Sequence, residues 1–174
     1  MGAYIMQAIP RRMAVFGTVA VLAAAGAGWG AVQASAATAG TRTCTTNDLY
    51  LSMGRQDAAA GSLYWPVRFT NTSTGTCALR GYPGVSVLST GHHRIGAAAS
   101  RSGEKYGTVK VAPGQTVTSV VRTANGPVGG PCNSTGKYLR VYPPASTEAV
   151  LVPAPLRVCS GLFTVGPVTT RTVF

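Results

Sequence analysis

The chain has 174 residues, with 15 Lys and Arg against 4 Asp and Glu, and its formal net charge is +11. The cations after residue 12 are scattered singly, without the interleaved aromatic residues typical of single-strand binders, so we expect no nucleic-acid partner. General acid–base chemistry on glycosides needs two facing carboxylates, and the spacing of Asp48, Asp57, Glu104 and Glu148 indicates no such pair.

The first 36 residues are typical of a secretory signal peptide. Arg11 and Arg12 form a positive n-region, residues 13–27 form an uncharged apolar run, and the Ala-Ser-Ala sequence at 34–36 suits signal peptidase. We therefore predict a signal peptide over 1–36 and one secreted, extracellular domain over 37–174, with no membrane span after cleavage. The alternative is a retained membrane anchor, because the apolar region approaches the roughly 20 residues that cross a bilayer.

The four cysteines, Cys44, Cys77, Cys132 and Cys159, all follow the signal. An even number of cysteines in an exported chain indicates two disulfides, with three possible pairings. We favour Cys44 with Cys77 and Cys132 with Cys159, and each loop of about 30 residues then stabilises the fold by roughly 3 to 4 kcal/mol. No C-x-x-C pair is present, so we expect no metal site.

Short β-prone segments separated by Gly, Pro, Asn and Ser clusters fill the rest of the chain. Apolar and polar residues alternate in several of them, as in Leu49, Leu51 and Met53, and no long amphipathic helix is predicted. The expected strands cover residues 48–53, 62–70, 77–79, 85–88, 106–111, 116–123, 138–142, 149–152 and 162–165. Short strands without intervening helices predict a β-sandwich or a barrel.

Proline and glycine residues predict how these strands begin and end. Pro66 inside the 62–70 strand predicts an edge strand or a bulge, and the Pro-Gly pair at 113–114 predicts a hairpin between its flanking strands. The Gly-Tyr-Pro-Gly segment at 81–84 predicts a tight turn. We expect Tyr82 to pack there with its hydroxyl hydrogen-bonded.

The order of these motifs resembles that of a known family. The chain contains Phe69-Thr70-Asn71-Thr72-Ser73, Cys77-x-Leu79-x-Gly81-Tyr82-Pro83-Gly84-Val85, Leu139-Arg140-Val141-x-Pro143-Pro144 and Val158-Cys159. Together they resemble the secreted actinobacterial family known as domain of unknown function 4232, over essentially the whole chain after the signal. The resemblance implies an all-β fold, an immunoglobulin-like antiparallel β-sandwich, and it supplies no functional residues.

No catalytic arrangement is recognisable in the sequence. His92 and His93 are the only histidines, and as neighbours in a glycine-flanked loop they point to opposite sides of an extended chain. We interpret them as solvated loop residues rather than a metal or catalytic site. We predict no catalytic residue, no metal and no cofactor. Most tyrosines and Trp65 are expected in the core, and the alternative is a carbohydrate-binding platform.

The sequence therefore predicts a non-catalytic extracellular module, monomeric, with a binding or structural role at the cell envelope. Its positive charge favours an anionic cell-wall polymer as the partner. The alternative is a secreted protein-binding or inhibitor domain that uses the loop at 125–131. An enzyme with an undescribed site is the third hypothesis.

Overall fold

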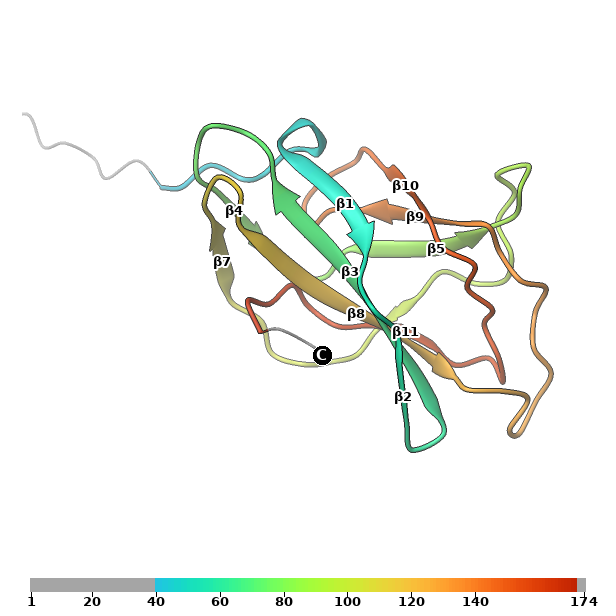
Figure 1. Ribbon diagram of the computed structural model, residues 1–174. Helices are drawn as coiled ribbons and strands as arrows, with labels where there is room; N and C mark the ends of the chain where they lie inside the picture. The colour runs from blue at the N-terminus through green and yellow to red at the C-terminus, as the bar shows by residue number, and fades with distance from the viewer. Residues whose placement is uncertain (1–39, 172–174) are drawn as a thin grey trace, which may run out of the picture. The chain divides into compact units, whose positions relative to one another are not determined.

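Residues 40–171, which the computed structural model describes, form eleven β-strands and one three-residue 3-10 helix and contain no α-helix (Figure 1). The elements are η1 (Thr46–Asp48), β1 (Leu49–Met53), β2 (Asp57–Ala59), β3 (Ser62–Asn71), β4 (Cys77–Arg80), β5 (Gly84–Leu88), β6 (Ser100–Arg101), β7 (Thr108–Val111), β8 (Thr116–Ala124), β9 (Tyr138–Tyr142), β10 (Val150–Pro153) and β11 (Phe163–Val165). The all-β prediction is confirmed for this part of the chain. The predicted signal peptide lies outside the described residues.

The strands form three sheets. The large sheet has the order β1-β3-β8-β11-β6, with β2 also paired to β3, while β10-β9-β5 and β4-β7 form two smaller sheets. All strand pairs are antiparallel except β11 with β6, which is parallel, so the expectation of a purely antiparallel fold is wrong at this pair. Figure 1 shows the strands of the large sheet running obliquely to β5 and β9.

A single hydrophobic core fills the space between the sheets. Strands contribute alternate residues to it, because successive side chains of a strand point to opposite faces. Its central members are almost fully buried: Val67, Phe69, Val117 and Val121 from the large sheet, and Val85, Val87, Leu139 and Val141 from the β10-β9-β5 sheet. Burial of each such side chain contributes roughly 1.5 to 3 kcal/mol.

Both favoured disulfide pairings are confirmed. Cys44 bonds to Cys77 with Cα atoms 4.9 Å apart, and Cys132 bonds to Cys159 with Cα atoms 3.8 Å apart. The first bridge ties the segment before η1 to β4, and the second joins the loops before β9 and β11. Two such bridges are typical of proteins that fold in an oxidising compartment.

The nine predicted strands are all present, and their ends lie within two residues of the expected positions. Two short strands were missed. Strand β2 lies between the strands expected at 48–53 and 62–70, and β6 follows an alanine run. Each has no more than three residues, so neither shows a recognisable alternation of apolar and polar residues.

The prediction that Pro66 marks an edge strand or a bulge is confirmed in its second form. Strand β3 lies inside the large sheet, but residues 54–56 oppose only residues 65–66, so the ladder contains a bulge at Pro66. On one side Pro66 pairs with Val120 of β8. On the other side, β1 ends its pairing at Val67 and β2 begins at Tyr64, so Pro66 falls in the gap between these two partners. The Gly54 amide donates to the carbonyl of Pro66 there, and a proline, which has no amide proton to donate, is tolerated at such an interruption of the ladder.

The predicted hairpin at 113–114 is wrong. The turn itself is present, and the amide of Gln115 donates to the carbonyl of Ala112 at 3.0 Å. However, β7 before the turn pairs with β4, whereas β8 after it pairs with β3. The reason lies in Asn71 at the end of β3, whose backbone bonds Gly114 and Gln115 and directs the chain into the large sheet.

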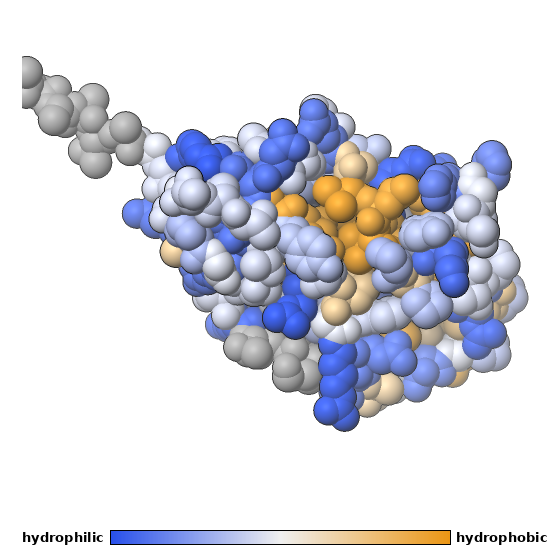
Figure 2. Space-filling view, turned by 45° about the horizontal axis from the view of Figure 1, so that its top comes forward, coloured by the Kyte–Doolittle hydropathy of each residue, from blue (hydrophilic) through white to orange (hydrophobic). Residues whose placement is uncertain are grey.

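The exposed edges of β1 and β10 meet at the surface. The two strands are in contact, and Figure 2 shows a hydrophobic patch in this region surrounded by hydrophilic side chains. Among the hydrophobic residues of β1 and β10, Met53 and Val150 are half-buried and Leu151 is 41% exposed. No helix among residues 40–171 is long and apolar enough to cross a membrane.

Candidate ligand-binding site

The outer face of the large sheet carries polar and cationic side chains in register. Alternation along β3 and β8 turns Val67 and Val121 into the core and leaves Tyr64 and Arg122 on the opposite face. Tyr64 pairs with Arg122, and Arg122 pairs in turn with Thr164 of β11. Three strands that are distant in the sequence therefore place a phenol, a guanidinium and a hydroxyl in one row.

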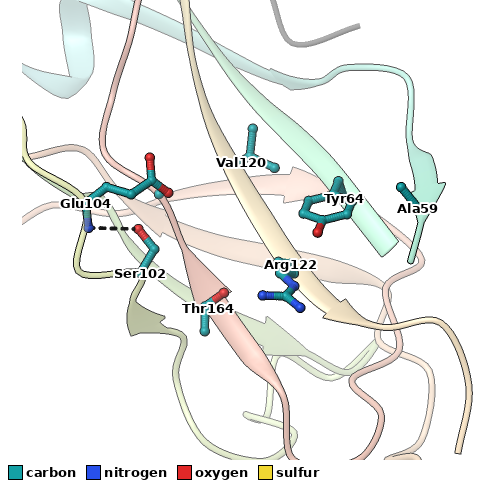
Figure 3. Close-up of a pocket in the computed structure, with 8 residues that line it drawn as sticks. Ala59, Tyr64, Ser102, Glu104, Val120, Arg122 and Thr164 are labelled. Carbon is teal, nitrogen blue, oxygen red and sulfur yellow. Dashed lines mark hydrogen bonds between the residues drawn. The ribbon is translucent and has the colours of Figure 1, made fainter. Parts of the chain in front are cut away.

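This row forms part of a surface hollow of about 610 Å³. The hollow is lined by Ala59, Tyr64, Ser102, Glu104, Val120, Arg122, Thr164 and Gly166. Figure 3 shows Glu104 and Arg122 on different sides of it, with Ser102 and Thr164 between them. A concave site with a small number of convergent polar groups is the usual form of a ligand-binding site.

Only one of the three guanidinium nitrogens of Arg122 forms a hydrogen bond within the described residues. Its Nε donates to Ser62 Oγ at 2.9 Å, and its central carbon lies 5.7 Å from the centre of the Tyr64 ring. Within residues 40–171, its two terminal nitrogens donate no hydrogen bond and form no ion pair. A planar guanidinium with both terminal nitrogens available can bind a carboxylate or a phosphate in a bidentate manner.

The backbone of Glu104 is fixed by its neighbours. Its carbonyl accepts a hydrogen bond from the hydroxyl of Tyr82, and its amide donates to Ser102 Oγ at 3.5 Å. Tyr82 is half-buried, so the expectation of a packed side chain with a hydrogen-bonded hydroxyl is confirmed. The carboxylate of Glu104 faces the hollow and has no cation within 4.0 Å in the described part of the chain.

A cluster of two tyrosine side chains, each with one arginine packed on its ring, supports this segment. Tyr82 and Tyr106 pack edge to face with ring centres 5.4 Å apart. Arg101 lies 5.7 Å from the centre of the Tyr82 ring, and Arg80 lies 5.4 Å from that of Tyr106. Such cation–π contacts contribute about 0.5 to 1 kcal/mol each at exposed sites, so they restrain the loop that carries Glu104.

A second hollow of about 460 Å³ adjoins the first, because Glu104, Val120 and Gly166 line both. Its lining adds Lys105 and Arg171, and the backbone carbonyl of Arg171 accepts a hydrogen bond from Thr118 on β8. The two hollows therefore form one continuous surface, with basic side chains at its far end.

A third hollow, of about 370 Å³, lies elsewhere, beside η1. It is lined by residues 43–47 and 145–148, and the hydroxyl of Thr46 donates to the carboxylate of Glu148 across it. The Glu148 carboxylate is thus already bound by the protein itself, unlike that of Glu104.

The one ion pair within residues 40–171 joins Arg42 to Asp48. Arg42 donates to both carboxylate oxygens of Asp48, at 2.6 and 2.8 Å, and the amide of Thr45 donates to Oδ2 at 2.8 Å. These hydrogen bonds, first of all those from Arg42, hold the pKa of the Asp48 carboxyl far below its usual range. This bidentate pair caps η1 and belongs to the scaffold.

The other cations in the described chain are not neutralised by the protein. Thirteen Lys and Arg residues lie within 40–171, and only Arg42 has a carboxylate within 4.0 Å. Arg68 and Arg122 project from the outer face of the large sheet, since Arg68 pairs with Thr118 and is exposed. Unpaired surface cations of this kind attract anionic partners.

The histidines lie away from these hollows. His92 and His93 are exposed in the loop after β5, and the ring of His92 packs edge to face against Tyr138. No group of three or more His, Cys, Asp or Glu side chains suited to a metal ion occurs within the described residues. Asp57 lies on β2, where it pairs with Tyr64, and it lines none of the three hollows.

The sequence did not reveal Arg122 and Glu104 as a site. Each belongs to a segment without a motif, and the hollow combines residues from β3, β8, β11 and the loop after β6. Alternation along the two strands could have predicted that Tyr64 and Arg122 lie on the outer face. Ser102 and Glu104 lie in a loop, where no alternation predicts which way a side chain points.

These features define a small all-β domain with two disulfides and a hollow on one sheet. The chain belongs to the family described as "Domain of unknown function (DUF4232)", whose model matches residues 44–169. No curated protein matches the sequence.

One solved structure that resembles the chain is the β-glucosidase from Kluyveromyces marxianus, with 14% sequence identity and a TM-score of 0.34. The match covers 68% of this chain and 14% of that protein's length. A similarity this low informs neither the fold nor the function.

Proposed function

We propose that this protein is a non-catalytic extracellular module that binds an anionic polymer of the cell envelope through the outer face of its large sheet. The observation that carries the proposal is the set of unneutralised arginines on this surface. Arg68 and Arg122 project from it, and Arg171 lines the adjoining hollow. A polymer can contact such spaced cations together, which a small anion cannot do.

Two further features support this proposal. Each of the three hollows is lined by a single carboxylate, Glu104 or Glu148, which favours a binding role over acid–base catalysis. The two disulfides favour an extracellular location. We also propose an immunoglobulin-like sandwich, since β1-β3-β8 and β10-β9-β5 enclose one core.

The test is retention of the secreted protein on purified cell walls over a series of salt concentrations. We expect retention at low salt and its loss as salt rises, because counterions screen exposed charges. The triple variant R68Q/R122Q/R171Q should lose most of the retention. Its matched control is R94Q/K137Q/R157Q, which removes the same charge from exposed positions that line none of the three hollows.

Equal losses in the two triple variants would mean that net charge, not this surface, binds the wall. No retention at low salt would contradict the proposal altogether.

A second candidate, a protein-binding domain, is favoured by one observation. Val128 is 72% exposed in the 125–131 loop, which Ser160 holds through hydrogen bonds to the carbonyls of Gly126 and Gly130. A loop with an exposed apolar residue suits a protein partner. Native co-purification of the secreted protein with and without V128R tests this candidate, and a partner retained equally by both forms would contradict it.

A further inference from the structure

We propose that the outer-face hollow binds a repeat unit that carries an anionic and a cationic group at once. This inference rests on the proposed function, because it specifies which polymer the surface selects. It concerns two side chains of opposite charge, Arg122 and Glu104, which line one hollow and do not pair with each other. An anionic polymer with amino substituents has the matching chemistry.

The anionic group of the ligand would meet Arg122. Ser62 is 2% exposed, and its Oγ accepts the Arg122 Nε hydrogen bond, while Arg122 Cζ lies 5.7 Å from the centre of the Tyr64 ring. The arginine is thus oriented before a ligand arrives. Its terminal nitrogens remain available for two parallel hydrogen bonds to a phosphate or a carboxylate.

The cationic group of the ligand would meet Glu104. In a domain with thirteen basic residues, a carboxylate could readily be neutralised, yet that of Glu104 has no cation within 4.0 Å in the described chain. The Tyr82 hydroxyl and the surrounding Arg–Tyr cluster fix its backbone. A carboxylate held this way repels a purely anionic ligand, so it selects for one that also carries an ammonium group.

The remaining lining suits the part of the ligand that joins the two charges. Ser102 and Thr164 offer hydroxyls between Glu104 and Arg122, and Val120 and the Tyr64 ring offer apolar surface (Figure 3). Hydroxyls and an aromatic ring are the groups that commonly bind a sugar or a polyol. The volume of about 610 Å³ accommodates a unit of that size.

The first experiment compares two small phosphate esters as ligands of the secreted protein by calorimetry at low salt. O-phosphoethanolamine carries an ammonium group, and glycerol 3-phosphate carries hydroxyls in its place. General attraction to a basic protein favours glycerol 3-phosphate, because it is the more anionic of the two. We expect the opposite order, with O-phosphoethanolamine bound about fivefold more tightly, the effect of one exposed charge pair.

Two variants assign this preference to its residues. E104Q should abolish the preference, so that both esters bind with similar affinity. R122Q should weaken both esters about tenfold, since it removes a charge-assisted pair of hydrogen bonds. The matched control is E148Q, which changes a carboxylate in a different hollow and should leave the preference intact.

The inference is overturned if the unmodified protein binds neither ester, binds glycerol 3-phosphate as tightly, or keeps its preference in E104Q.

The second experiment asks whether the unit belongs to the polymer. Cell walls are N-acetylated, which removes ammonium groups and makes the walls more anionic. Binding by charge alone would then increase, whereas our inference predicts reduced retention. Increased or unchanged retention overturns the inference for a polymer-borne unit. Binding to untreated walls at low salt tests the proposed function separately, so the two can fail independently.

Discussion

The two faces of the β3–β8 ladder differ in what their residues do, although both belong to the same two strands. On the inner face, Phe69 and Val121 are at most 1% exposed and pack in the core. On the outer face, Tyr64 and Arg122 line a hollow and are free to meet a ligand. Successive residues of these strands alternate between the core, where they stabilise the fold, and the outer face, where they can bind a ligand. Substitutions at neighbouring positions should therefore affect either stability or binding, but not both.

The inner face also contains polar exceptions. Asn71, Ser119 and Thr123 are buried, and each forms hydrogen bonds with the backbone of another segment, such as the carbonyl of Gly166 for Ser119. Buried polar groups are tolerated when they are paired in this way. These residues are therefore part of the scaffold despite their polarity.

The largest effect is expected at the centre of the inner face. The substitution Phe69→Ala removes a fully buried ring and should lower the free energy of unfolding by about 3 to 5 kcal/mol, measured by denaturant titration. The adjacent Arg68→Ala variant should change it by no more than about 0.5 kcal/mol but should reduce wall retention. Similar stability losses in the two variants would contradict the separation of the faces.

The next effect concerns the disulfides, which lie outside the binding surface. Removal of either bridge should cost about 3 to 4 kcal/mol by loop entropy alone. We expect C44A/C77A to cost more than C132A/C159A, because Cys44 and Cys77 are buried whereas Cys132 is half-buried. Denaturant midpoints measure both. If C132A/C159A folds but loses its ligand preference, this bridge contributes to the binding site. That result would contradict the separation of scaffold from binding surface.

The substitution Asn71→Ala tests a polar exception on the inner face. The Asn71 amide donates to the carbonyls of Gly75 and Val111 at 2.9 and 2.8 Å, and its oxygen accepts from the Ser73 amide at 2.9 Å. We expect a loss of about 3 kcal/mol, because buried groups are left unpaired. Thr70→Ala on the outer face is the control and should cost less than about 1 kcal/mol. Equal costs would mean that Asn71 contributes little to the scaffold.

The substitution Asp48→Asn removes the buried member of the ion pair and should cost about 2 kcal/mol at neutral pH. Folding lowers the Asp48 pKa, so the unfolded state binds more protons in acid. Its stabilising effect is present above the ordinary aspartate pKa and fades as the pH falls below about 4. Denaturant titrations at several pH values should therefore show the unmodified protein and the variant converging in acid. R42Q should show the same pH dependence with a smaller amplitude, because Thr45 still donates to Asp48, and a pH-independent difference would contradict this assignment.

The smallest effect is expected at Ser62, which orients Arg122 on the outer face. Ser62→Ala removes the acceptor that orients Arg122, and we expect about threefold weaker binding of phosphate esters, equivalent to the loss of one modest hydrogen bond. Calorimetry measures this change, and circular dichroism should show an unchanged fold. Unaltered affinity would show that the Tyr64 ring alone positions the guanidinium.

Much of the fold could be predicted because its signals are local. Alternation predicted β1 and β9, and the turn residues at 81–84 located the end of β4 and the start of β5. The cysteine pairing was favoured among three possibilities and is confirmed. In each case, a few neighbouring residues carry the information.

The partners of the strands could not be predicted in the same way. The turn at 113–114 has the composition of a hairpin, yet contacts with Asn71 send β7 and β8 to different sheets. Pro66 predicted an edge or a bulge, and only the pairing of β3 with both β1 and β2 decides that it is a bulge in an inner strand. These outcomes depend on residues that are distant in the chain.

The sequence by itself determined the all-β class, nine of the eleven strands and the excess of cations, since each follows from residue type and local pattern. Only the tertiary structure decided that Tyr64, Glu104, Arg122 and Thr164 share one hollow, because they come from four separate segments. The physical reason is that register places side chains side by side across strands, and register is set by the packing of the whole core.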